Sequence, residues 1–481
     1  MKKINITKAL SILALVFLIY SCDSLLDIEP QQSIFAEDAL SHEGILNTLY
    51  GSYARIAGPE LFAGTSIFHS DLLADDGDAN WAGTFIGYRQ MVWKELDPND
   101  GTITGKWLAA YRAINSANVV LKNLNLVNEG SRAVVEGEAK FIRGIMYFEL
   151  VRFYGLPYEP GSQNTQPGVP IVLEPYADLP SDAAFVSRAS VNAVYQQVLS
   201  DLGSAKDLLS PDIAGGNGGR ATSTVASAFL SRVYLQMGRY EEAAQEATLV
   251  IDQFGGESAL NATPRAAFNN DNYTSEDVFM INQNMTSNAG QANDGIGTFF
   301  ASLPGYGRGD LRITERHLDR FEEGDLRGKV QESVPGNSIS VVLDMHYVGT
   351  GTRRGFTMSS KWGKYDANIN VIRLAEMFLT RAEANFEKGG TPIGDLPVND
   401  INVIRNRAGL DDVAAVDRDI IRKERRLELA WEGHRLHDVK RWKEIVYDGD
   451  TPLAYDSPRL VLPIPQREMD VNPNLQQNAG Y

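Results

Sequence analysis

The stretch that decides the fold is Arg418-Asp419-Ile420-Ile421-Arg422-Lys423-Glu424-Arg425-Arg426-Leu427-Glu428-Leu429-Ala430-Trp431-Glu432-Gly433-His434-Arg435-Leu436-His437-Asp438-Val439-Lys440-Arg441-Trp442. It supplies charges of both signs, which buried ion pairs need. His434 and His437 are three residues apart and could share a metal ion, but the His-Glu-x-x-His order of zinc proteases is absent. We therefore expect these charges to pair with one another, and not to bind a metal or nucleic acid.

Segments before and after this stretch carry further motifs of one protein family. They are Cys22-Asp23-Ser24-Leu25-Leu26-Asp27-Ile28-Glu29-Pro30, residues 137–155, residues 374–384, Ile401-Asn402-Val403-Ile404-Arg405-Asn406-Arg407-Ala408-Gly409-Leu410, and residues 459–475. In their order and content they resemble the SusD/RagB family of outer-membrane lipoproteins from Bacteroidetes-type bacteria. The resemblance spans nearly the whole chain after residue 21. Its departures are Tyr20 just before the cysteine, and His437 where an aromatic residue is usual.

The resemblance implies a mostly α-helical domain, with four tetratricopeptide-like helical hairpins as scaffold and a loop-rich binding face with a few short strands. Family members are hinged lids on a SusC-like TonB-dependent transporter, to which they pass captured oligosaccharides; some relatives capture peptides. The family is not enzymatic. The resemblance also makes Glu428, Glu432, Arg435, Asp438 and Arg441 a structural ion-pair network.

The N-terminus has the pattern of a lipoprotein signal. Three lysines precede an apolar run at Ala9–Tyr20 that is too short to span a bilayer, and Cys22 is the only cysteine of the chain. We expect residues 1–21 to be a signal peptide, Cys22 to carry acyl chains such as palmitate, and residues 22–38 to be a tether. Residues 39–481 then form one domain. An ordinary secretory signal with an incidental cysteine is the alternative.

Composition narrows the function further. The net charge is −17, and removal of residues 1–21 takes away three lysines and no acid, which lowers it to −20. Such a chain is not expected to bind nucleic acid. The hydrophobic fraction of 43% suffices for a large core. We expect a protein anchored by its lipid to the outer membrane and facing the exterior.

Helical periodicity dominates the rest of the chain. It predicts helices at Ala39–Ile56, Ile103–Leu126, Val134–Tyr154, Val191–Leu209 and Ser223–Gln236. The run from Tyr234 to Ala243, with Gly238 at its turn, resembles a tetratricopeptide hairpin, and Leu374–Gly390 is a weaker copy. Between the helices lie long polar loops, in which Val278–Asn282 and Ile339–Leu343 are candidate strands. Long loops in compact domains are usually functional, so the binding surface is expected there.

Aromatic residues in these loops are the candidate ligand contacts, because sugar rings stack on aromatic faces while polar side chains take the hydroxyl groups. Trp81 is the first candidate, with Asp78 and Asn80 as hydroxyl partners. Tyr306 and Arg308 follow, and then Tyr88 and Trp362. For Trp93 and Trp362 we favour a place in the core.

The sequence gives weaker support to a metal site, to catalysis and to other binding functions. No cofactor is expected. Asp71, Asp75, Asp76 and Asp78 invite a Ca²⁺ site, but residues 76–87 lack the glycine and final glutamate of an EF-hand, so only an irregular site stays open. No Gly-x-Ser-x-Gly elbow is present. The alternatives are peptide capture, a helical glycosidase with two carboxylates across a groove, and a tetratricopeptide-type adaptor.

Overall fold

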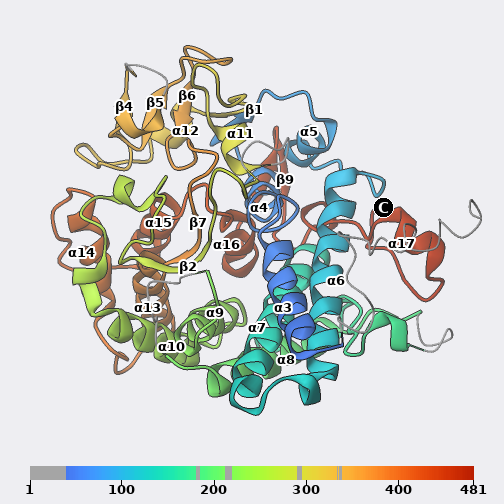
Figure 1. Cartoon of the computed structure of the whole chain (residues 1–481). Helices are drawn as coiled ribbons and strands as arrows, with labels where there is room; N and C mark the ends of the chain where they lie inside the picture. The colour runs from blue at the N-terminus through green and yellow to red at the C-terminus, as the bar shows by residue number, and fades with distance from the viewer. Residues whose placement is uncertain (1–39, 180–184, 212–218, 290–294, 333, 335–337) are drawn as a thin grey trace, which may run out of the picture.

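The computed structural model describes residues 40–481, apart from 180–184, 212–218, 290–294, 333 and 335–337. About half of these residues are helical and few are in strands, which confirms the predicted α-helical class (Figure 1). The longer helices are α3 (His42–Ile56), α6 (Gly101–Lys122), α7 (Glu129–Tyr154), α8 (Val191–Leu208), α9 (Ser223–Gln236), α10 (Tyr240–Phe254), α13 (Leu374–Lys388), α14 (Pro397–Arg407) and α15 (Arg418–Glu428). The shorter ones are α4 (Thr65–Leu73), α5 (Ile86–Val92), α11 (Ile296–Phe300), α12 (Glu315–Leu318), α16 (Arg435–Trp442) and α17 (Gln466–Val471).

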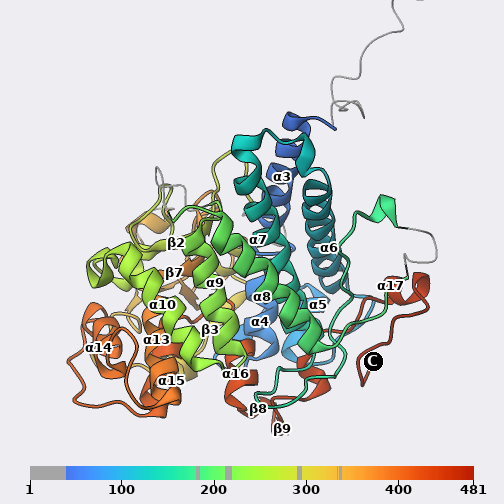
Figure 2. The same ribbon diagram turned by 90° about the horizontal axis from the view of Figure 1, so that it is seen from below.

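The long helices pack in pairs, and the pairs pack against one another. α3 lies on α6, α7 on α8, α9 on α10, and α13 on α14, while α6–α7, α8–α9 and α10–α13 contacts join successive pairs. Figure 2 shows this order across the molecule, from α6 on one side to α14 on the other. The arrangement is the predicted scaffold of tetratricopeptide-like hairpins.

Capping residues explain where the observed helices differ from the predicted ones. α3 begins at His42 because the Ser41 side chain accepts a hydrogen bond from the backbone N–H of Gly44. Asp100 caps α6 in the same way, accepting from Thr102 and Ile103, so that α6 begins before its first apolar residue. The apolar period alone does not reveal these polar first turns.

The turn between α9 and α10 depends on Gly238. Its φ is +68°, and a Cβ atom there would lie 2.7 Å from Cγ of Pro160. Beyond the turn, Ala243 and Ala244 pack in one apolar cluster with Ala384 of α13. The two repeat-like segments found in the sequence therefore lie against each other.

The strands are short, and two of the five pairings among the described residues join segments that are distant in the sequence. β1 (Ala79–Trp81) pairs with β3 (Leu311–Ile313), and β2 (Asp277–Ile281) with β7 (Ile369–Arg373), both antiparallel. β4 (Val330–Gln331), β5 (His346–Val348) and β6 (Thr357–Ser359) form one sheet, and β8 (Val446–Asp448) and β9 (Thr451–Leu453) another. β2 confirms the predicted strand at Val278–Asn282. The predicted strand at Ile339–Leu343 is wrong, because Ile339–Val341 forms a 3₁₀ turn capped by Ser338.

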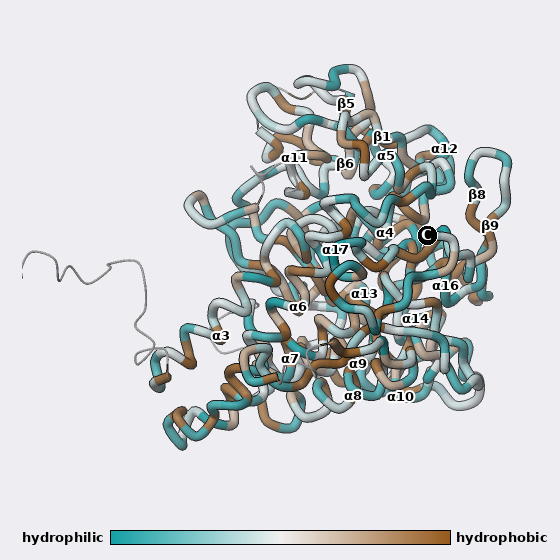
Figure 3. The backbone as a smooth tube through the Cα atoms, turned by 90° about the vertical axis from the view of Figure 1, so that its right-hand side faces the viewer, coloured by the Kyte–Doolittle hydropathy of each residue, from teal (hydrophilic) through white to brown (hydrophobic). Residues whose placement is uncertain are grey.

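The strands and short helices of the loop-rich part gather at one end of the molecule. Figures 1 and 3 show β1, β5 and β6 with α5, α11 and α12 at this end, and α8, α9 and α10 at the opposite end. One hydrophobic cluster reaches from Ile45 of α3 to Leu475 near the C-terminus.

The segment 418–442 forms two helices rather than one. α15 ends at Glu428, and the chain turns before α16 through Trp431 and Gly433, which have φ values of +65° and +81°. A side chain at Gly433 would meet the backbone of Ser66 on α4, with its Cβ 3.0 Å from that carbonyl oxygen. The turn therefore packs directly on α4.

The predicted signal peptide (1–21), the predicted acylation site at Cys22 and the predicted tether (22–38) lie outside the described residues. Among the described residues, no helix has both the length and the apolarity to cross a membrane.

Candidate functional site

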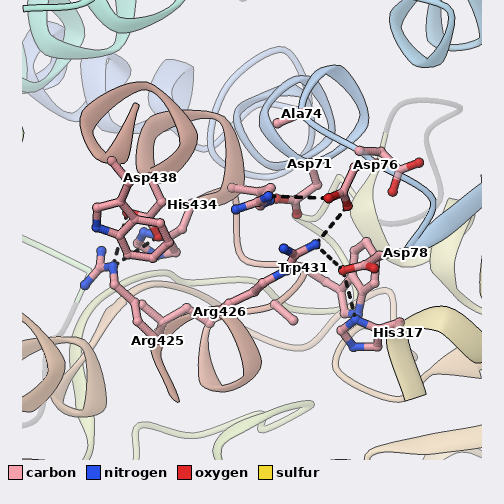
Figure 4. Close-up of a pocket in the computed structure, with 15 residues that line it drawn as sticks. Asp71, Ala74, Asp76, Asp78, His317, Arg425, Arg426, Trp431, His434 and Asp438 are labelled. Atoms are coloured by element: carbon pink, nitrogen blue, oxygen red, sulfur yellow. Dashed lines mark hydrogen bonds and ion pairs between the residues drawn. The ribbon is translucent and has the colours of Figure 1, made fainter. Parts of the chain in front are cut away.

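The base of the candidate site is formed where residues 71–78 meet residues 418–442 (Figure 4). Arg426 of α15 donates hydrogen bonds to Asp76 at 2.8 Å and to Asp78 at 2.7 Å. Arg320 donates to Asp78 at 2.9 Å, and Nδ1 of His317 lies 3.5 Å from the same carboxylate. These contacts fix the residue that immediately precedes β1.

Asp78 is thus a buried support and not an exposed ligand contact. Burial opposes its ionisation, but the hydrogen bond to His317 and the charge of Arg426 outweigh that effect and hold the pKa of Asp78 well below its usual range. Asp78 was a candidate hydroxyl partner, but it is buried, and arginines from two other segments occupy its oxygens.

Asp75 closes the loop before β1. Its carboxylate accepts from the backbone N–H groups of Gly77 at 3.1 Å and Ala79 at 3.0 Å. Burial raises the pKa of Asp75 to about 6. In the part of the chain that the structure describes, no three His, Cys, Asp or Glu side chains gather as a metal site.

The space between these two segments is small. It is lined by Asp71, Asp76 and Asp78 on one side and by Arg426, Trp431 and His434 on the other (Figure 4). Its volume is about 40 Å³, which is room for a few water molecules. The loop that it supports leads directly into β1, which carries Asn80 and Trp81.

Trp81 points into the core. Its side chain is 8% exposed and packs edge-on against Tyr88 at 5.0 Å and Phe299 at 5.2 Å between ring centroids. Trp81, the first candidate for a ligand contact, is thus a core residue, because aromatic residues of α5 and α11 that its polar sequence neighbours do not report surround it. Tyr88 is fully buried in the same cluster.

Asn80 points the other way, because side chains alternate along a strand. This candidate hydroxyl partner is exposed and lies directly opposite Arg312 in the β1–β3 pair. The guanidinium of Arg312 lies 3.6 Å from the ring centroid of Phe356, whose side chain is 43% exposed. A polar amide, a cation and an exposed aromatic ring therefore meet on one surface.

Arg308 extends this surface and joins the two loops singled out in the sequence. It donates to Asp310 at 2.7 Å and to the hydroxyl of Thr84 at 3.2 Å. Arg353 donates to the carbonyl of Ala82 at 2.8 Å. We call Asn80, Arg308, Arg312, Arg353 and Phe356 the outer loop surface.

The remaining aromatic candidates divide between core and surface. Tyr306 is mostly buried and packs against Tyr365 at 5.5 Å between centroids; burial raises its pKa above the usual range. Trp362 is a core residue, as favoured, and donates from Nε1 to the carbonyl of Trp431 at 2.8 Å. Trp93 is not a core residue: its side chain is 47% exposed at the end of α5.

Two family models match the sequence. One, described as "Starch-binding associating with outer membrane", matches residues 24–235, and the other, described as "SusD family", matches residues 231–451. The chain belongs to the SusD family.

Individual SusD-like proteins agree with this assignment. SusD-like protein P2 of Formosa agariphila is 27% identical over 547 residues, a match that covers 100% of both chains. The starch-binding protein SusD of Bacteroides thetaiotaomicron is 34% identical over 205 residues, 35% of each chain. The crystal structure of a SusD superfamily protein from B. thetaiotaomicron VPI-5482 has a TM-score of 0.78 at 25% identity, covering 91% of this chain and 99% of that one. The SusD-like fold is confirmed.

The SusD-family signature segment has the structural role that the resemblance implies. Asp438 pairs with Arg425 at 3.1 Å and with Arg441 at 2.8 Å. Glu432 accepts from Arg373 at 2.8 Å and from Lys361 at 2.7 Å. The segment is therefore an internal ion-pair network, and one of its arginines supports the candidate site.

Sequence reasoning missed Phe356 and Arg312. Phe356 follows Arg353-Arg354-Gly355 in one of the long polar loops, so the rule that selected Trp81 applies to it equally. Arg312 offered less signal, because only its pairing with a strand more than two hundred residues away places it beside Asn80.

Proposed function

We propose that this SusD-family protein captures oligosaccharides at the outer membrane and delivers them to a SusC-like TonB-dependent transporter, without chemical turnover. Two findings support the glycan ligand: the family description names starch binding and the outer membrane, and one relative is a starch-binding protein. Anchoring through an acylated Cys22 on the exterior side is part of the same proposal.

The observation that carries the proposal is the exposed ring of Phe356 beside Arg312 and Asn80. The ring offers a flat apolar face for the C–H groups of a sugar, and the amide and guanidinium groups offer hydrogen bonds for its hydroxyls. A few such contacts give weak binding after desolvation. Weak binding suits a protein that must release its ligand to a transporter.

A glycan-binding screen tests the proposal. Full-length protein purified in detergent is titrated against polysaccharides, oligosaccharides and peptide pools, together with Phe356→Ala. We expect binding to at least one glycan, and a loss of affinity of about tenfold in the variant because the stacking face is removed.

Tyr176→Ala is the matched control, because Tyr176 is 67% exposed but lies outside the outer loop surface. Equal losses in the two variants would reject Phe356 as the contact. Binding of peptides alone would assign the protein to peptide capture. Shortening of a bound glycan during incubation would contradict the absence of turnover.

A further inference from the structure

Positive charge concentrates on the outer loop surface, although the chain as a whole has a net charge of −17. Arg308 and Arg353 both reach Asp310, at 2.7 Å and 3.5 Å. Arg312 forms no ion pair within the described residues. Two of the three guanidinium groups therefore share one carboxylate, which is itself 2% exposed, and the surface retains an excess of positive charge.

The hydrogen-bonding capacity of this surface is also incomplete. Among the described residues, Nε of Arg312 and Nε of Arg353 have no hydrogen-bond partner. Both of these Nε atoms are buried, but the terminal NH₂ groups of Arg312, beside the Phe356 ring, make no hydrogen bond to a described residue. Two guanidinium N–H groups match a carboxylate or a sulfate group, with two parallel hydrogen bonds to one anion.

We propose that the outer loop surface binds an anionic glycan, one that carries carboxylate or sulfate groups, and that Arg312 receives the anion. This inference rests on the proposed glycan capture and adds the substrate class. In this arrangement Phe356 contacts the sugar ring and Asn80 a hydroxyl group, while Arg353 adds a second positive charge.

The acidity of the whole chain does not prevent this binding. At physiological salt, charges more than ~8 Å apart in solvent are largely screened. The charged groups that contact the anion therefore determine whether it binds. Burial, and then repulsion from Arg353, lowers the pKa of Arg312 from its usual range. A bound anion relieves that repulsion.

Matched pairs of polysaccharides test the charge requirement. Full-length protein in detergent is titrated with polygalacturonate and with its fully methyl-esterified form, and with κ-carrageenan and agarose. We expect at least one anionic member to bind about tenfold more tightly than its neutral counterpart, and less tightly when NaCl is raised from about 50 to about 300 mM. The pair that shows the difference identifies the anion as carboxylate or sulfate.

Arg312→Gln should abolish the preference for the anionic member, because the anionic member of the pair loses more affinity than the neutral one. Arg467→Gln removes the same charge from α17, where Arg467 pairs with the adjacent Glu468, and should leave the preference intact. Thermal melting of both variants checks folding.

The remaining outcomes overturn the inference in distinguishable ways. Equal loss of neutral and anionic binding in Arg312→Gln, with a lowered melting temperature, would make Arg312 purely structural. Equal binding of both members of each pair would reject the anionic class while the proposed function stands. Binding of none of the four polysaccharides rejects the inference, and binding of peptides alone rejects the proposed function with it.

Discussion

Asp71 lies on α4 at the base of the site, where its carboxyl group is buried against the turn before α16. Its Oδ2 accepts from the backbone N–H of Gly433 at 3.3 Å. Burial raises the pKa of Asp71 from 3.8 to about 7. Between these values the unfolded chain has lost a proton that the folded chain still holds, so stability falls as the pH rises from about 4 to about 7.

Asp71→Asn should remove this loss, because an amide has no proton to release in that range. The free energy of unfolding of the variant, relative to the wild type, should rise by a few kcal/mol between pH 4 and pH 7, since each pKa unit corresponds to about 1.4 kcal/mol. Urea unfolding at several pH values measures it. Asp207→Asn, at an exposed position of α8, should show no such trend. Parallel pH curves for wild type and Asp71→Asn would contradict the assignment.

The burial of a single aromatic residue could not be predicted from its neighbours in the sequence. Trp81 lies among polar residues and is buried, whereas Trp93 follows apolar residues and is half-exposed. The difference comes from Phe299 of α11, which is more than two hundred residues from Trp81 and packs against it. Nothing local to either tryptophan carries that information.

At the scale of elements, local sequence predicts the helices well and the strand pairs poorly. α9 occupies Ser223–Gln236 as expected, because its apolar period and the capping Thr222 are both local. β1 and β3 are three residues each, and Arg320 and Arg426 hold Asp78 at the edge of this pair. The candidate surface depends on such pairs, so its residues were predicted less well than the scaffold.

The α9–α10 turn gives a test of how tightly one hairpin is built. Gly238→Ala should lower the free energy of unfolding by about 2 kcal/mol or more, because it combines strain at positive φ with a clash against Pro160. Gly390→Ala is the matched control: Gly390 has the same φ of +68°, but a Cβ atom there meets nothing within 4 Å. Its loss should be about 1 kcal/mol, from strain alone. Equal urea midpoints for the two variants would mean that Pro160 moves aside.

For the whole molecule, the question is how a chain of net charge −17 is held where glycans arrive. No helix among the described residues is long and apolar enough to span a membrane. The family description nevertheless associates such proteins with the outer membrane. Two or more acyl chains on Cys22 would reconcile these observations, since each buried CH₂ contributes about 0.8 kcal/mol to membrane binding.

Cys22→Ser should therefore move the protein from the membrane fraction to the soluble fraction and abolish its labelling by an alkyne analogue of palmitate. Ser21→Ala is the control, because a small residue before the cysteine leaves the acylation signal intact. Unchanged membrane association of Cys22→Ser after a carbonate wash would show that something other than this lipid anchors the protein. In that case another contact with the membrane or with a membrane protein would have to hold the outer loop surface where glycans arrive.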